Sequence, residues 1–145
     1  MERCIYNMSV LASQRKTGDL TVIIKAKENA IYTLKITHNE KRFPKRYRFS
    51  VTNKLQDLAI DILTNLIQAN EIFPRTTEEY QHRLFLQRKA MASCRALNTL
   101  IDVASECFSI EKKTVAFWGR NVTEIRNMTV SWMNKDRSRF KDICN

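Results

Sequence analysis

A short basic segment, residues 41–48, holds the densest group of side chains that could contact a polyanion. It contains five Lys or Arg residues and no acid. The cations are Lys41, Arg42, Lys45, Arg46 and Arg48, and the interleaved aromatic residues are Phe43, Tyr47 and Phe49. Because cations neutralise phosphates and exposed rings stack on unpaired bases, we predict nucleic-acid contacts here. In the alternative interpretation, Phe43 and Phe49 close the end of a helical bundle and the charges are only solvated.

A second basic surface is predicted on a helix. Between Tyr80 and Ile101 every charged residue is a Lys or Arg, namely Arg83, Arg88, Lys89 and Arg95. Arg88 and Arg95 are seven residues apart and so share one helical face. A face of one sign forgoes stabilising acid–base pairs. We therefore expect this face to bind nucleic acid or, in the alternative, an acidic protein. Of the two basic surfaces, this one is the preferred candidate for the nucleic-acid site.

Catalytic patterns are weak. Arg75 and His82 are separated by six residues, which loosely resembles the arginine–histidine spacing of the helical HEPN ribonucleases, but a surface histidine at a helix start explains His82 more simply. Asp57 and Asp61 lie one turn apart, and two carboxylates alone make a poor metal site. A glycine-rich phosphate loop and a nucleophile elbow are absent from the sequence. We predict no enzymatic activity, no cofactor and no metal.

The four cysteines suggest packing rather than chemistry. Cys4, Cys94, Cys107 and Cys144 form no CxxC pair and stand apart from the histidines, so zinc is not expected. Cys94 and Cys107 fall on apolar helical faces, where a free cysteine behaves as a small hydrophobe. A reducing cytoplasm fits this usage.

Four helices must position these residues. The chain has 145 residues with only two glycines and two prolines, which favours an all-α fold. We predict helices over 19–41 with Asp19 as N-cap, from Ser50 to before Pro74, from a capping box at Thr76 and Glu79 to 108, and from 110 to about 133.

Each predicted helix has an apolar inner face. In the first it is Leu20, Ile23, Ile24, Ala30, Ile31 and Leu34. In the second it is Leu55, Leu58, Ala59, Ile62, Leu66 and Ala69, widened by Leu63 and Ile67. In the third it is Ala90, Cys94, Leu97, Ile101, Ala104 and Phe108, and in the fourth Val115, Trp118, Val122, Ile125, Thr129 and Trp132. Such faces predict an up-down-up-down antiparallel four-helix bundle over 19–133. Residues 1–18 form an N-terminal extension, and 134–145 a basic, disordered tail.

Charge and hydropathy narrow the partners. The chain has 25 Lys and Arg against 15 Asp and Glu, a net charge of +10, which favours polyanions. We expect no membrane-spanning helix, since no run approaches about 18 apolar residues, and no secretory signal. The apolar breadth of the second helix, with Trp118 and Trp132, favours a homo-oligomer.

Three segments resemble a known family: residues 43–70 (FPKRYRFSVTNKLQDLAIDILTNLIQAN), 88–106 (RKAMASCRALNTLIDVASE) and 112–125 (KKTVAFWGRNVTEI). Over residues 20–132 the chain is similar to the four-helix-bundle intervening-sequence proteins, whose founding members are encoded within bacterial ribosomal RNA genes. Among them it most resembles Avd, the accessory variability determinants of diversity-generating retroelements. The more specific matches are Phe43-Pro44-Lys45 and the spacing of Leu55, Ala59, Ile62 and Asn65.

The resemblance implies a homopentamer with a basic surface. It also implies binding to a reverse transcriptase and to its template RNA or DNA, in support of mutagenic copying. The family's binding surface would correspond to Arg83, Arg88, Lys89 and Arg95, with residues 41–48 nearby. The intervening-sequence branch has no agreed role, so an oligomeric scaffold that binds an acidic protein is the alternative.

Overall fold

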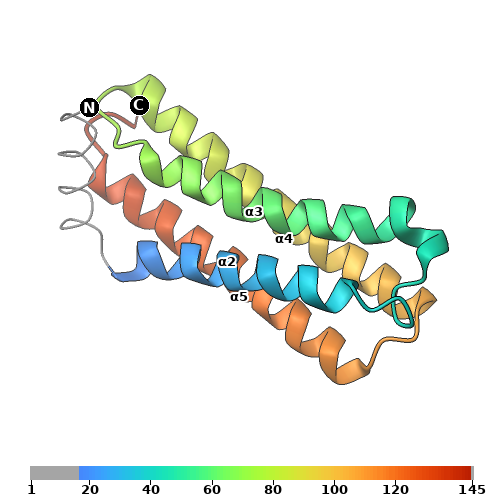
Figure 1. Ribbon diagram of the computed structural model, residues 1–145. Helices are drawn as coiled ribbons and strands as arrows, with labels where there is room; N and C mark the ends of the chain where they lie inside the picture. Colours follow the sequence, from blue (N-terminus) through green and yellow to red (C-terminus); the bar gives the residue numbers. More distant parts are fainter. Residues whose placement is uncertain (1–16, 145) are drawn as a thin grey trace.

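Four long helices make up most of the chain. The structure, a computed structural model, describes residues 17–144 (Figure 1). Helix α2 spans Thr17–Thr37, α3 Asn53–Glu71, α4 Thr77–Cys107 and α5 Lys112–Arg139. A 3-10 turn, η1 (Lys45–Tyr47), and a π-helical turn, η2 (Arg48–Thr52), precede α3. None of residues 17–144 lies in a strand, so the predicted all-α class is confirmed.

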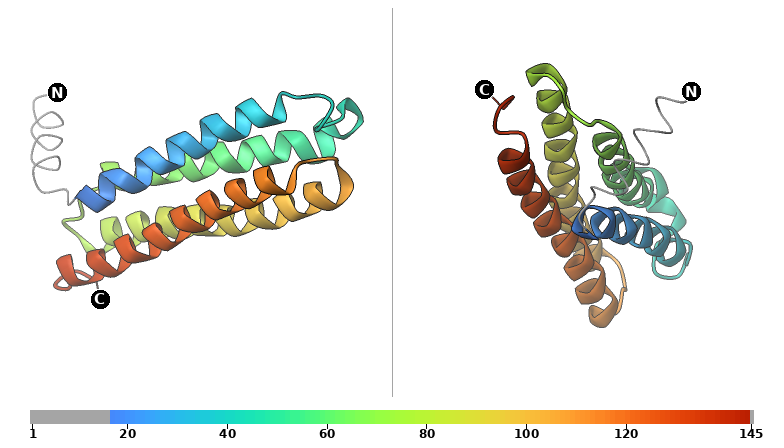
Figure 2. Two further views of the ribbon diagram at one scale, coloured as in Figure 1. Left: turned by 90° about the horizontal axis from the view of Figure 1, so that it is seen from below. Right: turned by 90° about the vertical axis from the view of Figure 1, so that its left-hand side faces the viewer.

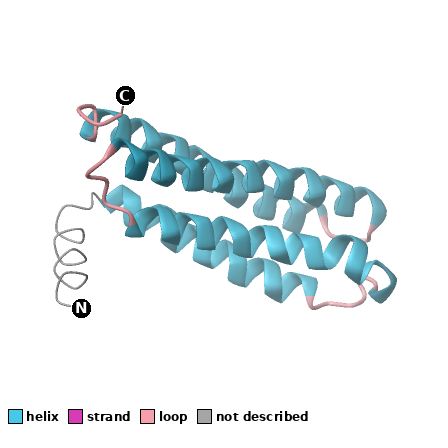
Figure 3. Cartoon of the chain, turned by 90° about the horizontal axis from the view of Figure 1, so that it is seen from above, coloured by secondary structure: helices cyan, strands magenta, loops and turns pink. Residues whose placement is uncertain are grey.

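The helices pack side by side as a bundle. α3 packs on α2 and α4, while α5 packs on α4 and α2 (Figure 2). Figure 1 shows that the connections 38–52 and 108–111 lie at the same end of the bundle. The connection 72–76 lies at the other end, and loops are confined to the two ends (Figure 3). Segments far apart in the sequence therefore share each end.

The predicted core of α3, α4 and α5 is largely confirmed. Buried rows with a period of three and four run along each helix, so the apolar stripes meet at the bundle axis. The buried apolar residues are Leu55, Ala59, Ile62, Leu66 and Ala69 in α3, Ala90, Cys94, Leu97, Ile101 and Ala104 in α4, and Trp118, Val122, Ile125 and Trp132 in α5. Of the other predicted members, Phe108 is buried, and Leu58, Leu63 and Val115 are only half-buried. Ile67 is 42% exposed, so its predicted burial is wrong. Thr129 is buried with the α5 row.

The predicted inner face of α2 is mostly wrong. Ile24, Ile31 and Leu34 are exposed by 51%, 44% and 43%. Ile23 is half-buried, and the side chain of Leu20 lies outside the described part. The residues that do face the core are smaller and often polar: Val22, Ala26, Asn29, Ala30, Thr33 and Thr37. The helix also begins at Thr17, two residues before the predicted cap, and ends at Thr37 rather than at residue 41.

Hydrogen bonds explain how α2 can bury threonines. Thr33 Oγ1 accepts a hydrogen bond from Trp118 Nε1 at 3.0 Å. Thr37 Oγ1 donates to Thr33 O at 2.6 Å and accepts from Gln56 Nε2 at 2.8 Å. A buried hydroxyl with partners avoids the desolvation cost that hydropathy patterns assign to it. Small polar side chains therefore let α2 approach the bulky indole of α5.

Two predicted helix starts can be compared with the structure. The cap at Thr76 is confirmed, because its Oγ1 accepts from Glu79 N at 3.2 Å. Ser50 does not cap α3, which begins at Asn53. Its hydroxyl, in η2, instead donates to Tyr47 O of η1 at 3.5 Å.

The disordered tail predicted for 134–145 is also corrected. α5 continues to Arg139, and both Asp136 and Phe140 are buried. Phe140 packs against Phe73 and Tyr80 with ring centroids 5.6 and 6.2 Å apart. Most of the predicted extension over 1–18, namely residues 1–16 with Cys4, lies outside the described residues.

Candidate nucleic-acid interface

The basic segment lies at the end of the bundle where α2 and α4 finish. Lys41, Lys45, Arg46 and Arg48 are exposed, and Arg42 is half-buried. The same end carries the start of α5, with Lys112 and Lys113 exposed. Residues 38–52 and 108–113, here called the basic end, contain seven Lys or Arg against two Glu, a net charge of +5. Half of the formal net charge of the chain is therefore displayed at one end.

The aromatic residues of the basic end divide into two roles. Phe43 is 3% exposed and packs edge-on against Phe108 and Trp118, with centroids 5.9 and 6.2 Å apart. It closes the bundle, as the alternative interpretation predicted. Phe49 does not, because it is 82% exposed on η2. Tyr47 is 39% exposed and has one side against Phe108. Phe49 is thus a ring presented to solvent directly after Arg48, and an exposed ring is what stacking on a base requires.

Only weak ion pairs restrain these cations. Arg42 pairs with Glu111 at 2.7 Å, and Lys45 and Arg48 share Glu40 at 3.6 and 3.5 Å. Such exposed pairs contribute about 0–1 kcal/mol and can exchange for a phosphate. Lys41 and Arg46 form no ion pair with any residue of 17–144, and Arg46 lies 5.9 Å from the ring centroid of Tyr47.

The basic face predicted on α4 contains three of its four predicted residues. Arg88, Lys89 and Arg95 are exposed on α4, and Lys89 Nζ lies 5.8 Å from the ring centre of exposed Phe85. Arg83, however, is 2% exposed, so its predicted place on the exposed basic face is wrong. The face that remains has three cations near the middle of the helix, fewer than the basic end holds.

Arg83 can be buried because each of its three guanidinium nitrogens has a hydrogen-bond partner. Its Nε and Nη2 donate to the two oxygens of Asp136 at 2.7 and 2.9 Å, and Nη1 donates to Ile72 O at 2.8 Å. Gln87 Nε2 donates to Asp136 Oδ2 at 2.9 Å, and the guanidinium carbon lies 4.8 Å from the ring centre of Trp132. A buried charge is tolerated only when an ion pair and hydrogen bonds compensate its desolvation, so Arg83 has a structural role.

The cysteines also divide. Cys94 is buried in the core as predicted, and burial raises the pKa of its thiol to about 12, so it stays protonated. Cys107 is exposed at the end of α4, contrary to the predicted packing role.

The residues considered for catalysis lie in two separate places. Arg75 and His82 are both exposed near the 72–76 connection, at the end opposite the basic end. Asp57 and Asp61 lie along a groove between α3 and α4 whose other walls include Leu58, Leu100 and Val103. Across residues 17–144 no three His, Cys, Asp or Glu side chains gather closely enough to hold a metal ion.

Protein-family models, curated proteins and solved structures gave no match to this chain. Over residues 17–144 the helices also include none that is long and apolar enough to cross a bilayer.

Sequence reasoning missed two features of this surface. The first is the contribution of Lys112 and Lys113, which the fold brings beside residues 38–52 although about 60 residues separate them in the chain. The second is a polar pocket between α2 and α5, whose walls come from helices that are not consecutive. Neither has a local sequence signal, since both depend on which helices the fold places side by side.

Proposed function

We propose that this protein is a non-enzymatic accessory protein that binds single-stranded RNA or DNA through its basic end. The observation that carries the proposal is the exposure of Phe49, at 82%, among cations held only by surface ion pairs. Cations at such a site contact phosphates and release counterions, while the ring stacks on a base. The site has no need of sequence-specific contacts for this role.

The resemblance to Avd proteins extends the proposal to partners. It supports a cytoplasmic homopentamer of up-down-up-down bundles that binds a reverse transcriptase and its template, and so assists mutagenic reverse transcription. The exposed side chains of Ile24, Ile31 and Leu34 on α2 support subunit contact, because they form an apolar strip that a neighbouring chain would cover.

Salt dependence tests the nucleic-acid function. The full chain is titrated into a labelled single-stranded RNA, followed by fluorescence anisotropy, between about 50 and 200 mM salt. We expect the affinity to fall steeply with salt and the RNA to stay intact. In Lys45→Glu/Arg46→Glu the slope of log K against log salt should shrink by about 1.4, since each single-strand phosphate contact contributes about 0.7.

The matched control is Lys135→Glu/Lys141→Glu. Both residues are exposed, and the substitutions change the net charge equally at the opposite end of the bundle. This control should keep the wild-type slope apart from a small long-range effect. Affinity that hardly changes with salt in the wild type removes the proposed function, and cleavage of the RNA would favour a ribonuclease.

A second function is favoured by the face on α4. Arg88, Lys89 and Arg95 are exposed beside Phe85, which is 56% exposed, and this mixture suits an acidic protein surface. The proposal here is an oligomeric scaffold. Arg88→Glu/Arg95→Glu should then abolish capture of the acidic partner and leave RNA affinity unchanged, whereas retained capture would exclude this face.

A further inference from the structure

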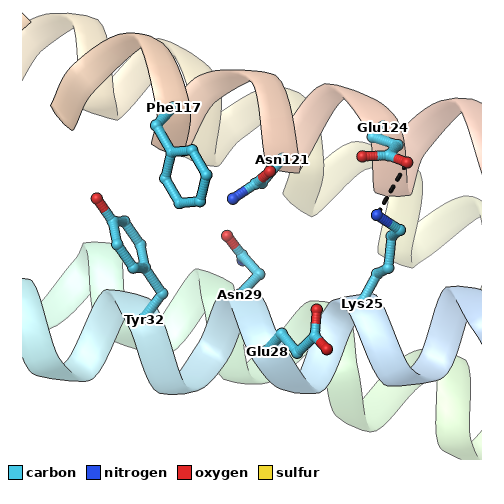
Figure 4. A pocket seen from close by; sticks show the side chains of 7 residues that line it. All are labelled: Lys25, Glu28, Asn29, Tyr32, Phe117, Asn121 and Glu124. Carbon is cyan, nitrogen blue, oxygen red and sulfur yellow. Dashed lines mark ion pairs between the residues drawn. The ribbon is translucent and has the colours of Figure 1, made fainter. Parts of the chain in front are cut away.

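A pocket of about 360 Å³ opens between residues 25–32 of α2 and residues 117–124 of α5 (Figure 4). Its size is within the range of pockets that hold small organic groups. Four side chains define its character: Asn29 and Tyr32 from α2, and Phe117 and Asn121 from α5. We call it the amide pocket.

Asn29 is the pocket residue whose polar side-chain atoms are buried. It is 2% exposed, and neither its Nδ2 nor its Oδ1 has a hydrogen-bond partner among residues 17–144. A buried polar group without a partner costs about 1–3 kcal/mol, and most buried polar groups in proteins are paired. The amide faces the pocket, where Figure 4 shows it pointing toward the Asn121 side chain. A ligand in the pocket would satisfy it.

The walls of the pocket differ. On the side nearer the basic end, the rings of Tyr32 and Phe117 meet edge-to-face with centroids 5.2 Å apart. On the far side, Lys25 Nζ pairs with Glu124 Oε1 at 3.0 Å, and Glu28 stands at the rim. The pocket therefore offers aromatic surface at one side, and amides in its middle.

These groups select the chemistry of the ligand. The Asn29 amide presents a donor and an acceptor, so a ligand that satisfies both must carry an acceptor and a donor side by side. Simple anions lack the donor, and the two carboxylates of the pocket against one ammonium repel them. Simple cations lack the acceptor. A nucleobase has both on its edge, pairs with an amide through two hydrogen bonds, and has flat faces that pack on aromatic rings.

The position of the pocket connects it to the basic end. Tyr32 lies five residues before the end of α2 and Phe117 five residues after the start of α5, about 7.5 Å along each helix. Burial raises the pKa of the Tyr32 hydroxyl, while Arg42 of the basic end acts in the opposite direction through its charge. Exposed Lys113 and Arg120 flank Phe117 one turn away on the same side of α5.

From this geometry we infer that the amide pocket receives one unpaired nucleobase of the strand whose phosphates contact the basic end. Asn29 and Asn121 pair with the edge of the base, and Tyr32 and Phe117 contact its face. The inference rests on the proposed function and adds a base-binding site to it, separate from stacking on Phe49.

The experiment compares two labelled decamers with equal phosphates, a single-stranded RNA and its abasic counterpart, by anisotropy with the full chain. The wild type should bind the base-bearing strand more tightly than the abasic strand. The pocket should contribute a factor of about ten to this ratio of affinities. Asn121→Ala should remove this factor and leave the affinity for the abasic strand unchanged. Asn127→Ala, at an exposed position of the same helix, is the matched control and should keep the full preference.

A second variant guards against a local folding defect. Phe117→Ala removes a ring that is 44% exposed, and Ile60→Ala, at a side chain that is 39% exposed on α3, is its control. Phe117→Ala should lower the preference for bases and its control should not. A preference unchanged in both Asn121→Ala and Phe117→Ala overturns the pocket and leaves the proposed function standing. If neither strand binds the wild type at low salt, the proposed function and the pocket fall together.

Discussion

The guanidinium of Arg83 and the carboxylate of Asp136 form a bidentate ion pair, at 2.7 and 2.9 Å, between α4 and the last turns of α5. Their side chains are only 2% and 1% exposed. The pair also reaches the end of α3 through Ile72 O. One buried interaction thus joins three helices at the end of the bundle opposite the basic end, and it holds the C-terminal part of α5 in place.

Removal of one partner should be costly. In Asp136→Asn the Arg83 charge stays buried without its counter-charge, and we expect the free energy of unfolding to fall by about 3–5 kcal/mol, measured by urea denaturation. Asp142→Asn, at an exposed position, is the control and should change it by less than about 0.5 kcal/mol. The double variant Arg83→Met/Asp136→Leu should regain most of the loss. Equal effects of the two single variants would contradict a structural role for the pair.

The buried Cys94 thiol should make the protein less stable in alkali. Burial raises its pKa from 9.0 to about 12 in the folded state. Between these values the unfolded chain loses a proton that the folded chain keeps, so unfolding becomes more favourable as pH rises through this window. We expect urea denaturation at about pH 8 and pH 10.5 to show this decline, and Cys94→Ala to reduce it.

Thiol labelling gives an independent check of the same burial. At about pH 8, alkylation followed by mass spectrometry should modify exposed Cys107 rapidly and Cys94 only under denaturant. Rapid modification of Cys94 in the folded protein, or an alkaline decline that persists in full in Cys94→Ala, would refute this assignment. Tyr80, whose pKa burial also raises to about 12, should account for part of the remaining decline.

The sequence predicted those parts of the fold in which large apolar residues recur at helical spacing. The rows along the two central helices are an example: Ile62 and Leu66 in α3 and Leu97 and Ile101 in α4 are buried as expected. The predicted inner face of α2 was wrong because the buried residues of this helix are small and hydrogen-bonded, as Thr33 is with Trp118, while its large residues are exposed. Hydropathy measures transfer from water, and it cannot anticipate a partner on another helix.

The candidate site was predictable only where it is local. The cations of residues 41–48 stand together in the sequence, and the structure exposes most of them. Arg83 was misplaced because its partner, Asp136, lies 53 residues away in a segment that lacks apolar periodicity. The amide pocket had no sequence signal at all, since Asn29 and Asn121 come to face one another only through the packing of α2 on α5.

Phe49 should contribute to nucleic-acid binding without contributing to stability. Because the ring is 82% exposed, Phe49→Ala should leave the free energy of unfolding within about 0.5 kcal/mol. Its affinity for single-stranded RNA should fall by about 1–3 kcal/mol, and its affinity for duplex RNA should fall less, since stacking needs an unpaired base. Anisotropy with both RNAs measures this. A larger loss in Phe85→Ala than in Phe49→Ala would place the nucleic acid on α4 instead.

The apolar strip of α2 should mediate assembly if the proposed homopentamer forms. Ile31 is 44% exposed, between Ile24 and Leu34, and Ile31→Lys would place a charge in a contact that buries this strip. We expect light scattering coupled to size exclusion to show an oligomer for the wild type and a single chain for Ile31→Lys, with the helical circular-dichroism signal retained. Thr99→Lys adds the same charge at an exposed position of α4 and should stay oligomeric. A wild type that elutes as a single chain at micromolar concentration, or an oligomer that Ile31→Lys leaves intact, would rule out assembly through α2.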